Sequence, residues 1–481
     1  MAQRSLDAHN IPRMPPEKTP LPGRQPPGSL SGQTPRQANS TADISRIFGW
    51  LRPAPHVPRR PAEEIKRLYP AYRWRIFEAA FIAYAGFYIV RNNLPPVSKE
   101  MGAALSYDKG MIGMILSGTA LAYGIGKFVM GYFADRSDAR KYVALGMLLT
   151  AAINFLFASS RTFGLHLFLW TLNGFVQGMG YGPCTRGLSH WYSVKERGTI
   201  FGVWNISHNV GGGIAGSLAA ACASHWGWPS AFYVPGAIAA FLSIYLLWRM
   251  RDTPQSVGLP PVEIYRNDYP PEEREDHERE LSAHDLLMKY LLPNKMLWVL
   301  SFANIFVYIA RYALVDWGPT YLKEMKGATI QQGGWSTTII EFAGAAGMLS
   351  MGWISDKIGG RRGRVSVISM LPLLIAFPAL LFTPKGMLWL DLFLFGVIGF
   401  FVYTPVLFSG VISLDLTTKK AVGTAAGFVG FFGYVGRALL GPGIGWLAQH
   451  HGWNSAIWAV IGCTVIAISL LAFTWNVRPR G

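Results

Sequence analysis

The chain has 481 residues, of which 51% are hydrophobic and 15% charged, and its mean hydropathy is +0.24. Soluble domains carry about a quarter charged residues, so this composition indicates a membrane protein. The formal net charge of +17 could suggest a nucleic-acid partner, but its distribution among loops favours a topological origin, and we expect no nucleic-acid binding. The sequence shows no phosphate loop, zinc motif or nucleophile elbow, so we expect no enzymatic activity and no cofactor or metal.

The first 60 residues are rich in proline, glycine, serine and glutamine. Such a composition cannot bury enough apolar surface to fold, so we expect residues 1–60 to form a disordered cytoplasmic extension. Residues 1–75 hold 13 Lys and Arg against 5 Asp and Glu, and therefore contribute 13 − 5 = +8 to the net charge.

Apolar stretches of the ~20 residues needed to cross a bilayer recur after this extension. We expect twelve transmembrane helices, near 77–97, 111–134, 142–159, 164–189, 199–221, 229–248, 296–317, 334–355, 365–383, 387–410, 421–446 and 454–475. They form two six-helix halves, residues 61–249 and 296–481, and residues 250–295 form a charged cytoplasmic linker between them. The expected fold class is an all-α membrane protein.

Lysine and arginine concentrate in alternate loops between these helices. They follow helices two, four, eight and ten, in the segments DRSDARK, SVKERG, DKIGGRRGR and TTKK. Loops of this kind stay on the cytoplasmic side of the membrane. We therefore expect a multi-pass membrane protein with both termini in the cytoplasm.

The two halves share sequence landmarks at nearly constant separation. GYFADR at residue 131 returns as GWISDK at residue 352, an offset of 352 − 131 = 221. HWGWPSAFY returns as HHGWNSAIW with an offset of 450 − 225 = 225. Tyr-Ile-x-Arg also occurs twice, ending at Arg91 and at Arg311, 311 − 91 = 220 residues apart. Three landmarks in the same order indicate that the halves are pseudo-symmetric.

Arg91 and Arg311 lie inside apolar stretches, where an arginine costs from ~2.5 to well over 10 kcal/mol. Its planar guanidinium can hold two phosphate oxygens at once, and a phosphate monoester carries a charge of about −1.5 to −2 at pH 7. Two arginines from matched helices would therefore roughly balance one phosphate. The alternative is that both arginines form structural ion pairs, with Asp316 or Glu341 as partners.

Other polar side chains accompany these arginines. Lys127 lies on the second predicted helix, and His208 lies on the fifth, three residues after Asn205. For His208 alone, a hydrogen-bonded packing role is the simpler interpretation. Tyrosines at helical spacing could line a polar path and donate to phosphate; the candidates are Tyr84, Tyr88, Tyr123, Tyr308, Tyr403 and Tyr434.

The loop after the second helix carries a family motif. Gly131, Asp135, Arg136 and Arg140 form G-x-x-x-D-R-x-x-x-R, which is typical of the major facilitator superfamily. With RDTPQSVGLPP, VWNISHNVGGG and the two arginines, the sequence resembles the organophosphate:phosphate antiporter family within it. The resemblance extends from about residue 47 to about residue 477.

This resemblance implies a monomer in the lipid bilayer of the bacterial plasma membrane. Such a protein would exchange a small organophosphate, most of all glycerol 3-phosphate, for inorganic phosphate. The resemblance places His208 in the substrate site, and it assigns the motif loop, with its copy at Asp356, to latching the cytoplasmic helix ends. The family often has a lysine directly after the first arginine, where this chain has Asn92. Two alternatives stay open: a proton-coupled organic-anion symporter, and a transporter-like sensor of sugar phosphates.

Overall fold

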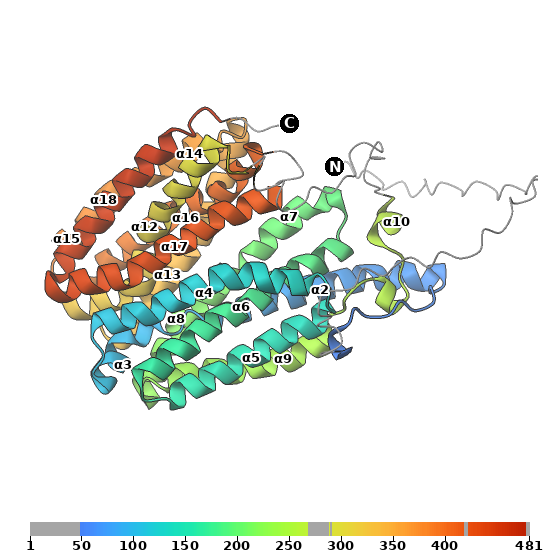
Figure 1. Ribbon diagram of the computed structural model, residues 1–481, viewed down its shortest axis with the longest axis horizontal. Coiled ribbons are helices and arrows are strands. Elements are labelled where there is room, and N and C mark those ends of the chain that lie inside the picture. Colours follow the sequence, from blue (N-terminus) through green and yellow to red (C-terminus); the bar gives the residue numbers. More distant parts are fainter. Residues whose placement is uncertain (1–48, 268–287, 289–290, 418–421, 478–481) are drawn as a thin grey trace, which may run out of the picture. The chain divides into compact units, whose positions relative to one another are not determined.

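The structure is a computed structural model that describes residues 49–267, 288, 291–417 and 422–477. Residues 1–48, expected to be disordered, and much of the expected linker lie outside the described residues. Within the described part, all regular elements are helices, and Figure 1 shows most of them as long rods lying alongside one another. The expected all-α fold is confirmed.

The first half of the described chain forms helices in the following order: η1 (Gly49–Leu51), α2 (Ala62–Ile89), η2 (Pro95–Val97), α3 (Ser98–Leu105), α4 (Lys109–Ala134), α5 (Ala139–Ser159), α6 (Phe163–Trp191), α7 (Val194–Asn205), α8 (Ser207–Trp226), α9 (Ser230–Arg249), η3 (Gln255–Val257) and α10 (Val262–Arg266). The second half forms α12 (Lys295–Met325), α13 (Ile330–Lys357), α14 (Arg362–Met370), α15 (Leu373–Phe382), α16 (Leu388–Asp415), α17 (Val422–His450) and α18 (Gly452–Ala472). Each half packs mainly on itself.

Every range in which a membrane helix is expected contains one. The range 199–221 holds the consecutive helices α7 and α8, and the range 365–383 holds α14 and α15, which separate at Pro372. By length and apolar composition, seven helical segments among the described residues could cross a membrane: α4, α5, α9, α12, α14 with α15, α16 and α18. That all twelve predicted helices cross it stays a prediction.

Short polar residues begin several helices. Asp108 accepts a hydrogen bond from the amide of Met111 at the start of α4 (2.7 Å), and Asp138 accepts one from the amide of Arg140 at the start of α5 (2.9 Å). Thr329 caps α13 in the same way. These side chains satisfy amides that have no partner in the first helical turn, and so they fix where the chain reverses direction.

The helix bundle has two ends. The linker end is where α4 finishes at Ala134 and α9 finishes at Arg249; the far end is where α12 finishes at Met325. The halves touch along α4 with α17 and along α8 with α13, and Figure 1 shows α4 running beside α17. Gly113 faces the carbonyl of Gly441, where a side chain would collide. Glycine therefore allows the closest approach of the halves, and this approach lies toward the far end.

Two ion pairs also join the halves at the far end. The Nζ atom of Lys323 lies 2.6 Å from a carboxylate oxygen of Glu100, and the next residue, Glu324, lies 3.1 Å from the Nζ atom of Lys109. Glu324 also accepts a hydrogen bond from the indole of Trp453 (2.7 Å). Neighbouring residues of opposite charge on α12 therefore bind opposite partners in the first half.

The linker end is bordered by the described part of the N-terminal segment. The amide of Val57 donates to the carbonyl of Gln255 (3.1 Å), and the amide of Arg60 donates to that of Gly258 (2.9 Å). Asp252, the aspartate of RDTPQS, accepts hydrogen bonds from the amide of Ala54 (3.2 Å) and from the first amide of α5. Residues 49–60, included in the expected disordered extension, are thus hydrogen-bonded to the first half.

The first membrane helix differs from the expected range 77–97. It ends at Ile89, and Arg91 lies in the turn that follows, whereas Arg311 lies inside the unbroken α12. The cause is the sequence Leu94-Pro95-Pro96, because proline lacks an amide proton and disfavours helix in the residue before it. The two arginines therefore occupy matched positions in sequence but different local structures.

Candidate functional site

Arg91 lies against two tyrosines. Its guanidinium carbon is 3.8 Å from the ring centre of Tyr88 and 4.6 Å from that of Tyr123. The residue is 3% exposed, and its Nε and Nη2 atoms have no hydrogen-bond partner among the described residues. A buried guanidinium with unused donors is suited to bind an anion.

Arg311 has the same kind of surroundings in the other half. Its guanidinium carbon is 4.0 Å from the ring centre of Tyr403 and 4.8 Å from that of Tyr312, and the residue is 4% exposed. In the part of the chain that the structure describes, no carboxylate oxygen lies within 4.0 Å of the side-chain nitrogens of either arginine. The alternative interpretation, structural ion pairs at Arg91 and Arg311, is therefore not supported.

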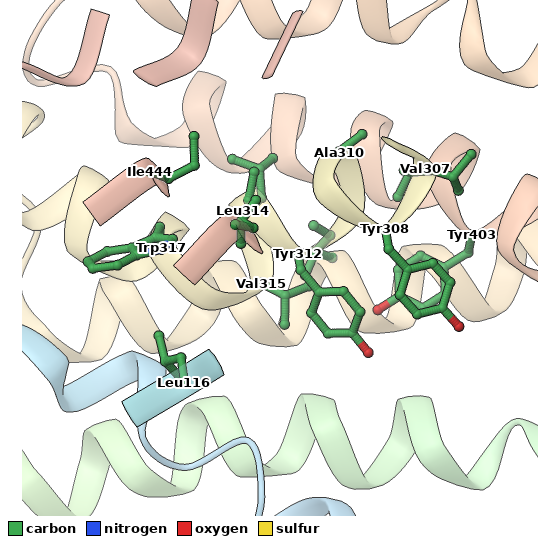
Figure 2. Close-up of a cluster of buried hydrophobic side chains, with 14 of the residues drawn as sticks. Leu116, Val307, Tyr308, Ala310, Tyr312, Leu314, Val315, Trp317, Tyr403 and Ile444 are labelled. Carbon is green, nitrogen blue, oxygen red and sulfur yellow. The ribbon is translucent and has the colours of Figure 1, made fainter. Parts of the chain in front are cut away.

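Aromatic side chains connect the two arginines by two routes. On one route the ring centres of Tyr123 and Tyr434 are 4.9 Å apart, those of Tyr434 and Tyr308 5.6 Å, and those of Tyr308 and Tyr312 5.6 Å. The other route runs through Tyr88, His208 and Tyr403. We call the aromatic residues of the two routes together the collar: Tyr88, Tyr123, Tyr434, Tyr308, Tyr312, Tyr403 and His208. Figure 2 shows the phenol rings of Tyr308, Tyr312 and Tyr403 projecting to the same side of α12.

His208 completes the second route. Its imidazole centre is 5.3 Å from that of Tyr88 and 6.5 Å from that of Tyr403, which lies in the other half. The Nδ1 atom is hydrogen-bonded to the backbone carbonyl of Asn205, the last residue of α7 before α8 begins. The sequence predicted both His208 and Asn205 as site residues. The structure places the side chain of His208 in the site, whereas Asn205 contacts it through its backbone carbonyl.

The two acids predicted as arginine partners are engaged elsewhere. Asp316 forms a bidentate ion pair with Arg437 on α17. Nη2 and Nε of Arg437 donate to its two carboxylate oxygens, at 2.8 and 2.9 Å. Glu341 on α13 accepts a hydrogen bond from the side-chain amide of Asn209 on α8 (3.0 Å), so it joins the two halves. Both acids are buried.

Arg437 is a site residue that the sequence analysis overlooked. Its guanidinium carbon lies 4.0 Å from the ring centre of Tyr312, which therefore has Arg311 on one side and Arg437 on another. Arg437 stands in the apolar segment GYVGRALL, so the test applied to Arg91 and Arg311 would have found it. It was missed because it has no counterpart in the first half.

A cavity of about 610 Å³ lies between the collar and the linker end. It reaches from Tyr434 of the collar to Asp135, just after the end of α4, and Lys127 lines it with its Nζ atom 4.1 Å from the ring centre of Tyr181. Tyr84 packs behind the collar, stacked on Trp204 at 4.8 Å. Lys127 is thus placed in the approach to the arginines, beyond the collar.

The predicted latch residues lie at the linker end, where Asp135 lines the end of the cavity, and none of them belongs to the collar. Asp135 and Asp356 are exposed; Arg136 covers the ring of Tyr132 (3.8 Å), and Arg140 is 3.9 Å from Asp138. Their gating role stays a prediction. The described residues contain no group of three His, Cys, Asp or Glu side chains that could hold a metal ion.

The aromatic contacts compensate only part of the cost of burying these charges. A desolvated cation–π contact contributes about 2 kcal/mol, and each of Arg91 and Arg311 makes two. Removing an ion from water costs several kcal/mol even after relaxation. The site therefore retains a net attraction for anions that no described carboxylate satisfies.

Two groups of helices that enclose a buried cationic site, reached by a cavity from one end, define a membrane transporter. Residues 77–439 match the Major Facilitator Superfamily, and the chain belongs to this superfamily. Its fold is shared by a bacterial homolog to the human lysosomal transporter Spinster, in an inward-facing and unoccupied conformation. The TM-score is 0.71 at 15% identity, over 84% of this chain and 97% of that one.

Two relatives share 40% identity with the chain. One is a glycerol-3-phosphate transporter of Bacillus subtilis (strain 168), matched over 89% of this chain and 98% of its own length. The other is a probable hexose phosphate transport protein of Chlamydia trachomatis serovar D, matched over 87% and 94%. The resemblance to the organophosphate:phosphate antiporter family is thereby confirmed.

Proposed function

We propose that this protein exchanges a small organophosphate for inorganic phosphate across the bacterial inner membrane, and that glycerol 3-phosphate is its preferred organophosphate. The observation that carries the proposal is the pair of buried arginines, Arg91 and Arg311, one from each half. Neither has a described carboxylate partner, and the collar joins them. The relatives that transport glycerol 3-phosphate and hexose phosphate support the substrate class.

One phosphate group would be held by both arginines at once. Its charge of about −1.5 to −2 nearly balances two guanidinium charges, and each guanidinium offers a fork of donors that matches two phosphate oxygens. For this contact the phenols of Tyr88, Tyr123 and Tyr403 move off the guanidinium faces. A ligand held by both halves then favours their closure around it.

Alternating access would come from rocking of one half against the other. The cavity at the linker end and the ion pairs and glycine contacts at the far end support a carrier that opens at one end at a time. The alternate-loop charges favour cytoplasmic termini, so the 610 Å³ cavity would face the cytoplasm. A single chain contains the whole site, which favours a monomer in the lipid bilayer.

Asn92 would change the charge next to the proposed phosphate site. Asn92 follows Arg91 where the family often has lysine, and it is buried beside Gly212 and Glu341. One cation fewer lowers the attraction for phosphate esters in general, because glycerol 3-phosphate and hexose phosphates carry the same phosphate charge. Glycerol 3-phosphate is placed first because the chain matches 98% of the length of a glycerol-3-phosphate transporter at 40% identity.

Exchange in reconstituted vesicles tests the proposal. Purified protein in vesicles loaded with phosphate should accumulate labelled glycerol 3-phosphate, should fail to do so without internal phosphate, and should be insensitive to a proton uncoupler. Uptake that requires a proton gradient would establish the symporter instead. Binding without counterflow would favour the sensor. Competition by a panel of phosphate esters then ranks the substrates.

A further inference from the structure

The break after α2 exposes a backbone carbonyl that two side chains bind. In a continuous helix the carbonyl of Val90 would accept the amide of residue 94. Here it accepts a hydrogen bond from Nδ2 of Asn154 on α5 (3.2 Å) and another from Nδ2 of Asn173 on α6 (3.1 Å). Val90 directly precedes Arg91, so these bonds hold the peptide that joins the two residues.

A third asparagine fixes the other side of Arg91. Nδ2 of Asn93 donates to Oδ1 of Asn154 (2.9 Å) and to the carbonyl of Ala231 at the start of α9 (2.9 Å). Asn93, Asn154 and Asn173 are each 0% exposed. The turn that carries Arg91 is therefore tied to α5, α6 and α9, all of the first half.

Among the described residues of the second half there is no such network around Arg311, and the sequence explains why none is needed. With an offset of 220, Asn93 corresponds to Ala313. With any offset from 221 to 225, Asn154 corresponds to a position in IAFPA (residues 375–379), and Asn173 to one in LFGVI (residues 394–398). All these positions are apolar, and Arg311 lies in an unbroken helix whose own hydrogen bonds hold its backbone.

We propose that Asn154 and Asn173 are positioning residues for Arg91, which they hold in the geometry that lets it share a phosphate with Arg311. This inference rests on the proposed function. The amides replace the helical hydrogen bond that the carbonyl of Val90 loses where α2 breaks, and they make Arg91 move with the first half as one body. A guanidinium on an unheld turn would reach the phosphate only in a fraction of its conformations, so affinity would fall.

The test compares Asn154→Leu, Asn173→Leu and the double variant with the unaltered protein in phosphate-loaded vesicles. Each single variant should raise KM for phosphate roughly ten- to hundredfold, because small misplacements of a binding group have effects of this size, and should leave the maximal rate nearly unchanged. The double variant should raise KM further, since the carbonyl of Val90 then has no donor. Asn173→Ser, a milder change, serves if the leucine variants do not fold.

Ser243→Ala is the matched control. It removes another buried hydrogen bond between helices of the same half, from Oγ of Ser243 on α9 to the carbonyl of Ala144 on α5 (2.7 Å), and this bond does not involve the turn that carries Arg91. It should lower the unfolding temperature about as much as Asn173→Ser and leave KM unchanged. Equal KM values in the asparagine variants and the control would overturn the proposal.

A binding measurement separates this inference from the proposed function. Phosphate should raise the unfolding temperature of the unaltered protein in detergent and do so at much higher concentration in the asparagine variants. Suppose that phosphate raises the unfolding temperature of the unaltered protein, that the asparagine variants need more phosphate for the same rise, and that no exchange occurs. The proposed function then fails and the positioning role stands. If exchange occurs and the asparagine variants bind phosphate as the unaltered protein does, the positioning role fails alone.

Discussion

At the scale of single residues, the guanidinium fork is what distinguishes Arg91 and Arg311 from other cations. Lysine keeps the charge but offers a single ammonium in place of two parallel donors. We expect Arg91→Lys and Arg311→Lys each to lower exchange by at least about a hundredfold, and Lys127→Ala and His208→Ala to lower it less. Labelled phosphate exchange in vesicles measures this.

The control for the arginine variants is Arg364→Lys. Its guanidinium binds the carbonyl of Trp475 (3.3 Å) at the linker end, so exchange should be unchanged. Near-normal phosphate exchange by both Arg91→Lys and Arg311→Lys would show that the two arginines are structural.

The ion pair between Asp316 and Arg437 gives a second prediction at this scale. Asp316→Asn leaves a buried guanidinium without its counter-ion, which should reduce the free energy of unfolding by about 3–5 kcal/mol. Replacing both residues, Asp316→Leu with Arg437→Met, should recover most of this loss, because well-packed apolar side chains substitute for a buried pair. Thermal unfolding of the purified variants in detergent measures both. Additive losses in the double variant would contradict the pairing.

Much of the site could be predicted from single residues, and the exceptions have physical causes. Arg91 and Arg311 stood out because a charge in an apolar segment is costly and the segment is repeated. Arg437 is equally costly but unrepeated, so a search guided by the repeat missed it. The pairing of Asp316 with Arg437 depends on the contact of α12 with α17, and no local spacing encodes that contact.

At the scale of helices, the apolar stretches predict where helices lie but not where they break. The segments around Arg91 and Arg311 look alike, yet α2 stops at Ile89 and α12 continues through Pro319. Two prolines in succession remove two amides, whereas one proline removes one. The asparagines that compensate the break come from α5 and α6, so the local sequence could not show that a break is tolerated.

The start of α7 offers a prediction on pH. Burial alone would raise the pKa of Glu196, but hydrogen bonds from Arg73 on α2 and Arg266 on α10 hold that pKa below its ordinary value. A carboxyl group whose pKa is lowered by folding stabilises the fold above its unfolded pKa, and this stability is lost as pH falls through the folded pKa. The unfolding temperature should therefore drop on acidification below about pH 5.

Glu196→Gln tests this assignment. The variant should be less stable than the unaltered protein at pH 7 and should lose less stability on acidification. An identical acid dependence in the two proteins would mean that other carboxylates cause the drop. Thermal unfolding between pH 3 and 7 decides, and the vesicle assay at pH 7 should show exchange little affected.

At the scale of the whole molecule, the two far-end ion pairs hold the halves together. Lys323→Glu would place two negative charges next to each other, at positions 323 and 100. Their repulsion would weaken the contact between the halves at the far end. A cysteine at Thr320, which lines a cavity of about 300 Å³ at this end, should then react faster with a membrane-impermeant maleimide. Lys323→Glu combined with Glu100→Lys restores the opposite charges and should slow the reaction again.

The native cysteines set the background of that experiment. Cys184 and Cys222 are buried and Cys463 is partly buried. Labelling of the chain without Thr320→Cys therefore measures the background reaction of the native cysteines. If charge reversal leaves the rate of labelling unchanged, the far-end pairs do not hold the closed state. The halves would then be held by the glycine contacts of α4 with α17 and of α8 with α13.

For the exchange proposed above, the lack of a carboxylate partner for Arg91 and Arg311 among the described residues would also set how tightly the two fluxes are coupled. An empty carrier that turned over would move two uncompensated charges through a closed, water-poor state, and each 1.4 kcal/mol of that penalty slows the empty step tenfold. In the proposed exchange this electrostatic penalty would suppress slippage of the empty carrier. A carboxylate introduced at Tyr403, as Tyr403→Glu, would neutralise Arg311 in the empty carrier, and vesicles should then leak phosphate down its gradient with nothing returning.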